Sequence, residues 1–119
     1  MIVDKMTTTV VNVKVGHIRP FYNDLREWMD DPNNVYIGRA GIVFIDGKRF
    51  PPHASPWANP FKIGRDGTRD EVLEKYRVYI TKKIRSCEVD LEGLRGKTLG
   101  CWCYPERCHG DILVEMMEE

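Results

Sequence analysis

Residues 97–119, KTLGCWCYPERCHGDILVEMMEE, predict a strand, a short return and a helix. The strand is expected over 97–103, where residues alternate between two faces, and Pro105 is typical of the turn after it. The helix is expected over 110–119. Its apolar residues recur at helical spacing and would form the buried side: Ile112, Leu113, Met116 and Met117. A strand followed by a helix indicates an α/β unit.

The segment before this stretch predicts a long helix beginning at Thr68. Thr68 and Glu71 have the spacing of a capping box, in which each side chain accepts a hydrogen bond from the other residue's backbone N–H. Apolar residues then follow a 3.6-residue period, which indicates a core-facing stripe: Val72, Leu73, Tyr76, Tyr79, Ile80 and Ile84. Residues 88–96 are expected to form a connector with one helical turn.

The first half of the chain predicts two strands, a helix and a hairpin. The β-branched stretch 7–15, TTTVVNVKV, predicts a strand. A short helix is expected over 24–31, with Asn23 as its N-cap and Pro32 ending it. A second strand is expected over 34–41, and Asp46-Gly47 is typical of a two-residue hairpin turn.

This order of elements predicts the fold class. Strands that alternate with helices favour a mostly parallel sheet. We therefore expect an α/β fold, a small Rossmann-like layered domain with a mostly parallel sheet flanked by helices and a β-hairpin excursion. A length of 119 residues is consistent with a single domain over 1–119.

Composition narrows the class of protein further. Hydrophobic residues make up 42% and charged residues 30% of the chain, and no apolar run is long enough to span a membrane. The N-terminal segment lacks the pattern of a secretory signal, so we expect an intracellular protein with reduced thiols. The net charge is zero, which argues against binding nucleic acid by bulk electrostatics.

Residues 51–67 predict a long ordered loop. This stretch holds four prolines and two glycines, which disfavour regular structure, while Trp57 and Phe61 indicate packing. Loops of this length in compact domains are usually functional or disordered. We therefore expect this loop to be part of a site.

Three of the 4 cysteines and one of the 3 histidines lie within residues 101–109, and this cluster permits three interpretations. Cys101, Cys103, Cys108 and His109 are a legitimate ligand set for zinc, although they are more compressed in sequence than familiar zinc sites. Alternatively, the N-terminus of the last helix could lower the pKa of Cys108, with His109 as its proton partner, or hold an anion. In the third interpretation the cysteines are small buried residues and His109 caps the helix.

Cations follow both predicted N-terminal strands and could hold an anionic ligand. His17 and Arg19 come after the first strand and Arg39 after the second, at the sheet edge where such folds bind ligands. Together with Lys62 these side chains could clamp a phosphate or a carboxylate. Ordinary surface charges are the alternative explanation for each of them.

The motifs VVNVKVGH, VYIGRAG, SPWANPFKIG and LRGKTLGCWCYPERCHGDILVEM, taken together, resemble a family catalogued as domain of unknown function number four-three-two-six. The form REWMDDPNNVYIGR is similar to versions from large DNA viruses. The resemblance implies a viral protein with a site that includes Asn59 and Asp111 beside Arg39 and the Cys/His cluster. It implies no reaction.

The sequence therefore leaves two alternative hypotheses about function. The first is binding, with or without chemical processing, of a nucleotide-like or other anionic ligand at the sheet edge, with Cys108, His109 and Asp111 as candidate catalytic residues. The alternative is a non-enzymatic viral interaction protein, which could be a homodimer. In this case the Cys/His cluster has a structural role, with or without zinc. A nucleic-acid partner ranks below both.

Overall fold

A computed structural model describes residues 7–118. Residues 1–6, on which part of the expectation about a secretory signal depends, and Glu119 lie outside the described residues. The elements are β1 (Thr9–Asn12), α1 (Val15–Ile18), α2 (Leu25–Asp30), β2 (Asn34–Tyr36), β3 (Val43–Ile45), β4 (Lys48–Phe50), α3 (Arg69–Arg85), the 3-10 helix η1 (Leu91–Leu94), β5 (Thr98–Cys101) and α4 (His109–Glu118).

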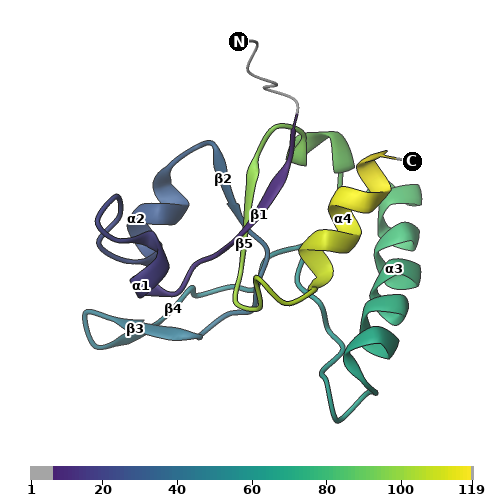
Figure 1. Ribbon diagram of the computed structural model, residues 1–119, viewed down its shortest axis with the longest axis horizontal. Coiled ribbons are helices and arrows are strands. Elements are labelled where there is room, and N and C mark those ends of the chain that lie inside the picture. Colours follow the sequence, from purple (N-terminus) through teal and green to yellow (C-terminus); the bar gives the residue numbers. More distant parts are fainter. Residues whose placement is uncertain (1–6, 119) are drawn as a thin grey trace.

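Three parallel strands form the central sheet, in the order β1-β5-β2, and the β3–β4 hairpin stands apart from it. The middle strand β5 comes last in the chain and pairs with both others, Val11 and Tyr36 lying opposite Gly100. Helices α3 and α4 cover one face of the sheet, and α1 and α2 cover the other (Figure 1). The predicted α/β fold, with a parallel sheet flanked by helices and a hairpin excursion, is confirmed.

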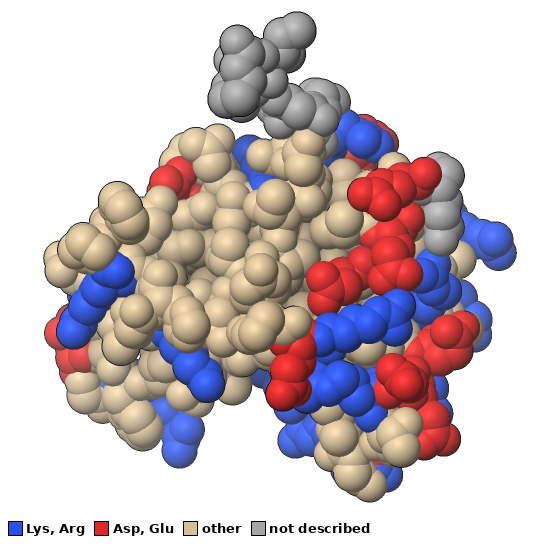
Figure 2. Space-filling view, in the orientation of Figure 1, with Lys and Arg blue, Asp and Glu red and all other residues tan. Residues whose placement is uncertain are grey.

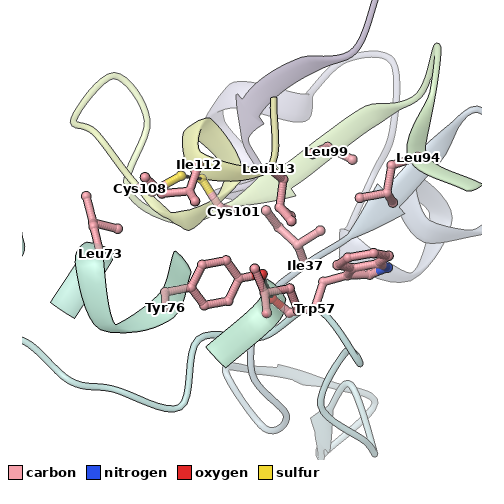
Figure 3. Close-up of a cluster of buried hydrophobic side chains, with 11 residues drawn as sticks. Ile37, Trp57, Leu73, Tyr76, Leu94, Leu99, Cys101, Cys108, Ile112 and Leu113 are labelled. Atoms are coloured by element: carbon pink, nitrogen blue, oxygen red, sulfur yellow. Dashed lines mark hydrogen bonds between the residues drawn. The ribbon is translucent and has the colours of Figure 1, made fainter. Parts of the chain in front are cut away.

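Two hydrophobic cores lie on opposite faces of this sheet. The larger one joins the sheet to α3, α4 and η1, and the loop contributes Trp57 to it (Figure 3). Its fully buried members include Tyr76, Leu99 and Leu113. The smaller core packs Ile18, Leu25 and Trp28 of α1 and α2 against the other face. Burial of apolar surface on both faces explains why the short strands are held in place.

Helix α3 begins as its sequence predicts. The Thr68 hydroxyl accepts a hydrogen bond from the Glu71 backbone N–H, and the Glu71 carboxylate accepts one from the Thr68 N–H at 3.0 Å. The predicted apolar stripe is buried or partly buried; Val72 lines the cavity described below, and the rest of the stripe packs in the larger core. The predicted turn in the connector is also present, as η1.

Helix α2 begins one residue later than predicted, and its N-cap is Asp24 rather than Asn23. The Asp24 carboxylate accepts a hydrogen bond from the Glu27 N–H at 2.9 Å. The Asn23 side chain instead donates to the Glu27 carboxylate. Both side chains are good caps, and the backbone position of Asp24 decided between them.

The hairpin turn is confirmed at Asp46-Gly47. Both residues have positive φ, 53° for Asp46 and 76° for Gly47, and this backbone geometry favours Asx-Gly pairs. Residues 51–67 contain no helix or strand, as predicted. Trp57 and the Phe61–Tyr79 ring contact, with centroids 6.1 Å apart, keep this loop packed.

The strands are shorter than the sequence indicates, and this changes the cysteine cluster. β1 ends at Asn12 and leads into α1, a four-residue helix where the sequence predicts none. β5 ends at Cys101, so Cys103 does not share a strand face with Cys101 as predicted. The chain turns after β5 because the Asn12 amide donates to the carbonyls of Trp102 and Tyr104, at 3.3 and 2.8 Å.

Acidic and basic side chains alternate over α3 and α4 on one side of the molecule (Figure 2). Glu115 of α4 pairs with Arg77 at 3.4 Å and with Arg107 at 2.9 Å. These pairs leave no continuous surface of one sign on this part of the face. No helix among residues 7–118 is long and apolar enough to cross a membrane.

Candidate functional site

A cavity of about 540 Å³ opens at the carboxyl ends of β2 and β5. Gly38, Arg39 and Ile42, which lie between β2 and β3, form one wall, and Cys101, Trp102 and Cys103 at the end of β5 form the floor. The loop and the first turns of α3 and α4 complete it, through Asn59, Phe61, Lys62, Ile63, Arg69, Val72, Leu73, Cys108 and His109. The carboxyl edge of a parallel sheet is where α/β folds usually place a ligand.

The cavity brings together most of the residues that the sequence singles out. Arg39, Asn59 and Lys62 line it with the Cys/His cluster, although they come from widely separated parts of the chain. His17 and Arg19 do not line it. His17 is exposed on α1, on the opposite face of the sheet, and the Arg19 guanidinium donates to the Asn23 carbonyl at 3.1 Å.

The predicted cations of the cavity have different roles. The Arg39 guanidinium donates to the carbonyls of Asn59 and Phe61, both at 3.3 Å, so it ties the loop to the end of β2. Within the described residues the Lys62 ammonium has no hydrogen-bond or ion-pair partner. Lys62 is therefore the cation most available to a ligand.

Arg69, which the sequence analysis missed, also lines the cavity. Its guanidinium donates to the Arg107 carbonyl at 2.9 Å and pairs with Glu106 at 2.5 Å. These contacts join the start of α3 to the turn between β5 and α4. The capping box at Thr68 could have predicted this position of Arg69. It places Arg69, the next residue, at the start of a helix that faces the site.

Cys101 and Cys108 form a buried pair of free thiols at the floor of the cavity. Their Sγ atoms are 3.0 Å apart, and one of the two thiols donates to the other (Figure 3). Both residues are only 2% exposed. The sequence spacing predicted that Cys101 would neighbour Cys103, but the turn brings Cys108 to it instead.

The two thiols of this pair differ in acidity. The hydrogen bond from Cys108 lowers the pKa of Cys101 to about 7, against the opposing effect of burial, and backbone N–H groups of Cys103 and Tyr104 add to the decrease. The pKa of Cys108 is raised by its bond to Cys101 and by burial. The more acidic thiol is thus Cys101, whereas the sequence favoured Cys108.

His109 faces the second strand rather than Cys108. Its Nε2 lies 2.6 Å from the Ile37 carbonyl oxygen. A carbonyl can only accept, so Nε2 carries the hydrogen and the neutral ring keeps its lone pair on Nδ1. Burial lowers the pKa of His109, which favours this neutral form.

Asp111 positions the start of α4 and does not line the cavity. Its carboxylate accepts a hydrogen bond from the Cys108 backbone N–H at 2.8 Å, and its own N–H donates to the Cys108 carbonyl at 3.0 Å. This arrangement fixes Cys108 beside Cys101. Asp111 thus contacts Cys108 from outside the cavity, and its catalytic role stays a prediction.

The four predicted zinc ligands do not form a ligand set. Among residues 7–118, no group of three or more His, Cys, Asp or Glu side chains is placed to hold a metal ion. The His109 Nε2 is bonded to a carbonyl, and only two of the three sulfur atoms form a close pair. The side chains as arranged therefore do not fit zinc.

A chain of polar contacts that the sequence analysis missed supports the cavity wall. The Trp102 indole donates to the Tyr36 hydroxyl at 2.9 Å, and that hydroxyl donates to the Arg39 carbonyl at 2.7 Å. These bonds link the turn after β5 to the turn after β2. No sequence motif predicts the bond between Trp102 and Tyr36, because these residues are 66 positions apart and meet only when β2 and β5 pair.

Comparison with known proteins shows the family of this chain. The family model described as Domain of unknown function (DUF4326) matches residues 22–119. The chain belongs to this family. The predicted resemblance is therefore confirmed, and the matched range includes every residue that lines the cavity.

Two viral proteins are similar to this DUF4326 chain. Uncharacterized protein R718 of Acanthamoeba polyphaga mimivirus is 36% identical over 91 residues, covering 70% of the chain and 65% of the relative. An uncharacterized 12.4 kDa protein in the nrdA-td intergenic region of Enterobacteria phage T4 is 38% identical over 65 residues, covering 51% of the chain and 58% of the relative. The chain thus spans less than two thirds of either relative. No solved structure matches it.

Proposed function

We propose that this domain binds a small ligand that combines an anionic group with an apolar, nucleotide-like body. The observation that carries the proposal is the cavity at the carboxyl edge of the sheet, shared by Arg39, Asn59 and Lys62. Its volume of about 540 Å³ lies within the range of roughly 300–1,000 Å³ typical of small-molecule sites.

The lining of the cavity supports both halves of such a ligand. Aromatic and aliphatic side chains, among them Ile42, Phe61 and Trp102, offer apolar surface for a planar body. Lys62, which has no ion-pair partner among residues 7–118, supplies a positive charge at the same cavity. A charge-assisted hydrogen bond from an ammonium to a phosphate or carboxylate oxygen is stronger than a neutral one.

Isothermal titration calorimetry with a nucleoside 5′-monophosphate, the uncharged nucleoside and inorganic phosphate tests the proposal. We expect the monophosphate to bind most tightly. Replacing Lys62 with Gln should weaken it by about tenfold, the effect of roughly 1.4 kcal/mol, and leave the nucleoside unaffected. The matched control is Lys48→Gln, which removes an exposed lysine of the hairpin that does not line the cavity.

Two outcomes would contradict this function. If neither the monophosphate nor phosphate binds saturably, the cavity does not take such an anion. If Lys48→Gln weakens binding as much as Lys62→Gln, the interaction depends on general charge and not on the cavity. Concentration-dependent dimerisation without any ligand binding would support the alternative of a non-enzymatic interaction protein.

A further inference from the structure

We propose that Cys101 and Cys108 form a thiol–disulfide exchange site that reduces a small-molecule disulfide entering the cavity. Cys101 is the attacking thiol and Cys108 is the resolving thiol. This inference goes beyond ligand binding and does not depend on the anionic group of the ligand.

The geometry of the pair carries the inference. The two Sγ atoms are 3.0 Å apart as free thiols, and a disulfide bond of about 2.0 Å requires them to approach by only ~1 Å. Cys101 is held at the end of β5 and Cys108 directly before α4, so both elements can stay folded when the bond forms. Both residues line the cavity with 2% of their surface exposed, and the cavity is the side from which a small molecule would reach them.

The surroundings assign different roles to the two sulfur atoms. A Cys101 thiolate can accept a hydrogen bond from the Cys108 thiol 3.0 Å away, and the backbone N–H groups of Cys103 and Tyr104 further favour this ionised form. Asn12 acts as a positioning residue, because its amide holds the carbonyls on either side of Cys103. Cys108 keeps its proton until Cys101 has reacted.

The exchange balances in two steps. The Cys101 thiolate attacks one sulfur of a disulfide R–S–S–R′, forming a Cys101–S–S–R bond while R′S⁻ leaves and takes a proton from solvent. Cys108 then attacks the Cys101 sulfur, its proton passes to the departing RS⁻, and the Cys101–Cys108 disulfide forms. The protein pair loses two electrons, and the small disulfide gains them as two thiols.

The test uses 4,4′-dithiodipyridine, an uncharged disulfide that releases a coloured thiopyridone with each exchange. Exposed Cys87 and cavity-lining Cys103 are first replaced by Ser, so that only the pair can react. We expect this protein to release two thiopyridones rapidly. Its product should carry no adduct and should be lighter than the reduced protein by the mass of two hydrogen atoms.

Single substitutions in this background separate the two roles. Cys108→Ser should release one thiopyridone and keep the adduct on Cys101, because no resolving thiol remains. Cys101→Ser should slow the release by about tenfold or more, because the buried Cys108 keeps its proton. Unchanged fast release in Cys101→Ser, or two stable adducts in place of a disulfide, would overturn the proposal.

A measurement on the unsubstituted protein covers the case in which a variant fails to fold. Trypsin cleaves after Lys97 and Arg107, which places Cys101 and Cys108 on the separate peptides 98–107 and 108–119. Mass spectrometry of the oxidised product should find these peptides linked through Cys101. A link through Cys103, or no link, would refute the assignment.

The experiments distinguish failure of the proposed thiol–disulfide exchange from failure of the proposed ligand binding. Lys62→Gln should leave thiopyridone release unchanged, because the probe is uncharged. A protein that binds the monophosphate but releases no thiopyridone would refute the exchange alone, and one that releases two thiopyridones without binding the monophosphate would refute the proposed ligand alone. If Lys62→Gln also abolishes the exchange, the thiol pair does not act independently and the inference falls.

Discussion

Gly100 lies in the middle of β5, where the sheet leaves no room for a side chain. A Cβ at this position would come within 2.5 Å of a Val13 methyl carbon and would overlap the Trp28 ring. Both neighbours belong to the smaller core and are almost fully buried. The glycine therefore allows α2 to pack closely on the central strand.

Gly100→Ala should lower the free energy of unfolding by about 1–3 kcal/mol, because the added methyl group forces buried neighbours to move. Urea denaturation followed by circular dichroism measures this change. The matched control is Gly16→Ala, since nothing lies within 4 Å of a Cβ there. Equal stability of the two variants would mean that the contact with Trp28 does not restrict this position.

The Cys101–Cys108 pair predicts a dependence of stability on pH. The pKa of Cys101 is lowered from 9.0 to about 7, so its thiolate contributes stability that is fully present above about pH 9 and is lost as the pH falls through 7. The raised pKa of Cys108 has the opposite effect at higher pH. The contribution of the pair should therefore be largest near pH 9.

Wild-type protein should gain on the order of 1 kcal/mol relative to Cys101→Ser between about pH 7 and pH 9. Urea denaturation across this range measures the difference, and the ultraviolet absorbance of the thiolate follows the ionisation directly. The titratable or charged groups around the pair are Tyr36 on β2, Arg39 after it, Tyr76 on α3, and His109 and Asp111 on α4. A parallel pH profile of the two proteins would contradict the assignment to Cys101.

At the scale of elements, the 51–67 loop is held to the rest of the protein by a few specific contacts. The Tyr76 hydroxyl donates to the Trp57 carbonyl at 2.7 Å, which ties the first half of the loop to α3. Arg39 ties the second half to the end of β2 through the Asn59 and Phe61 carbonyls. The wall of the cavity that contains Lys62 therefore depends on Arg39.

Arg39→Ala should release this part of the loop and increase trypsin cleavage after Lys62 or Arg65. We expect cleavage about fivefold faster, the effect of losing roughly 1 kcal/mol of hydrogen bonding. Limited proteolysis followed by mass spectrometry measures the rate and the site. Arg49→Ala is the control, because Arg49 bonds the Gly41 carbonyl outside the loop. Unchanged cleavage would show that other contacts hold the loop.

At the scale of the whole molecule, one three-stranded sheet separates two cores. Leu113 is fully buried in the larger core, and Leu25 is 4% exposed in the smaller one. Both cores pack against β5, which has a parallel partner on each side. We expect the two sides to unfold together as one cooperative unit.

Leu113→Ala and Leu25→Ala should each destabilise the protein by about 2–5 kcal/mol. In both variants, circular dichroism and tryptophan fluorescence should report the same single transition. Val78→Ala, at a position of α3 that is 53% exposed, should change stability by less than about 0.5 kcal/mol. Two separated transitions would show that 1–119 is not a single cooperative domain.

Local patterns in the sequence determined most of the elements, though not α1 or the strand ends, and several of the residues at the site. The Thr68 capping box, the apolar stripe of α3 and the Asp46-Gly47 turn act over a few residues, so the sequence alone predicts them. The position of Arg39 after a strand, together with the proline-rich loop, was enough to predict that both line one site. Asn23 failed as the N-cap because two adjacent residues can cap equally well.

Only the tertiary structure decided which side chains meet. His17 and Arg19 follow a strand as Arg39 does, but α1 carries them to the opposite face of the sheet. Cys101 pairs with Cys108 and not with Cys103, because Asn12 ends the strand early and turns the chain. Such contacts join residues up to 92 positions apart. They depend on how strands pair and helices pack, and patterns among neighbouring residues in the sequence do not predict these long-range contacts.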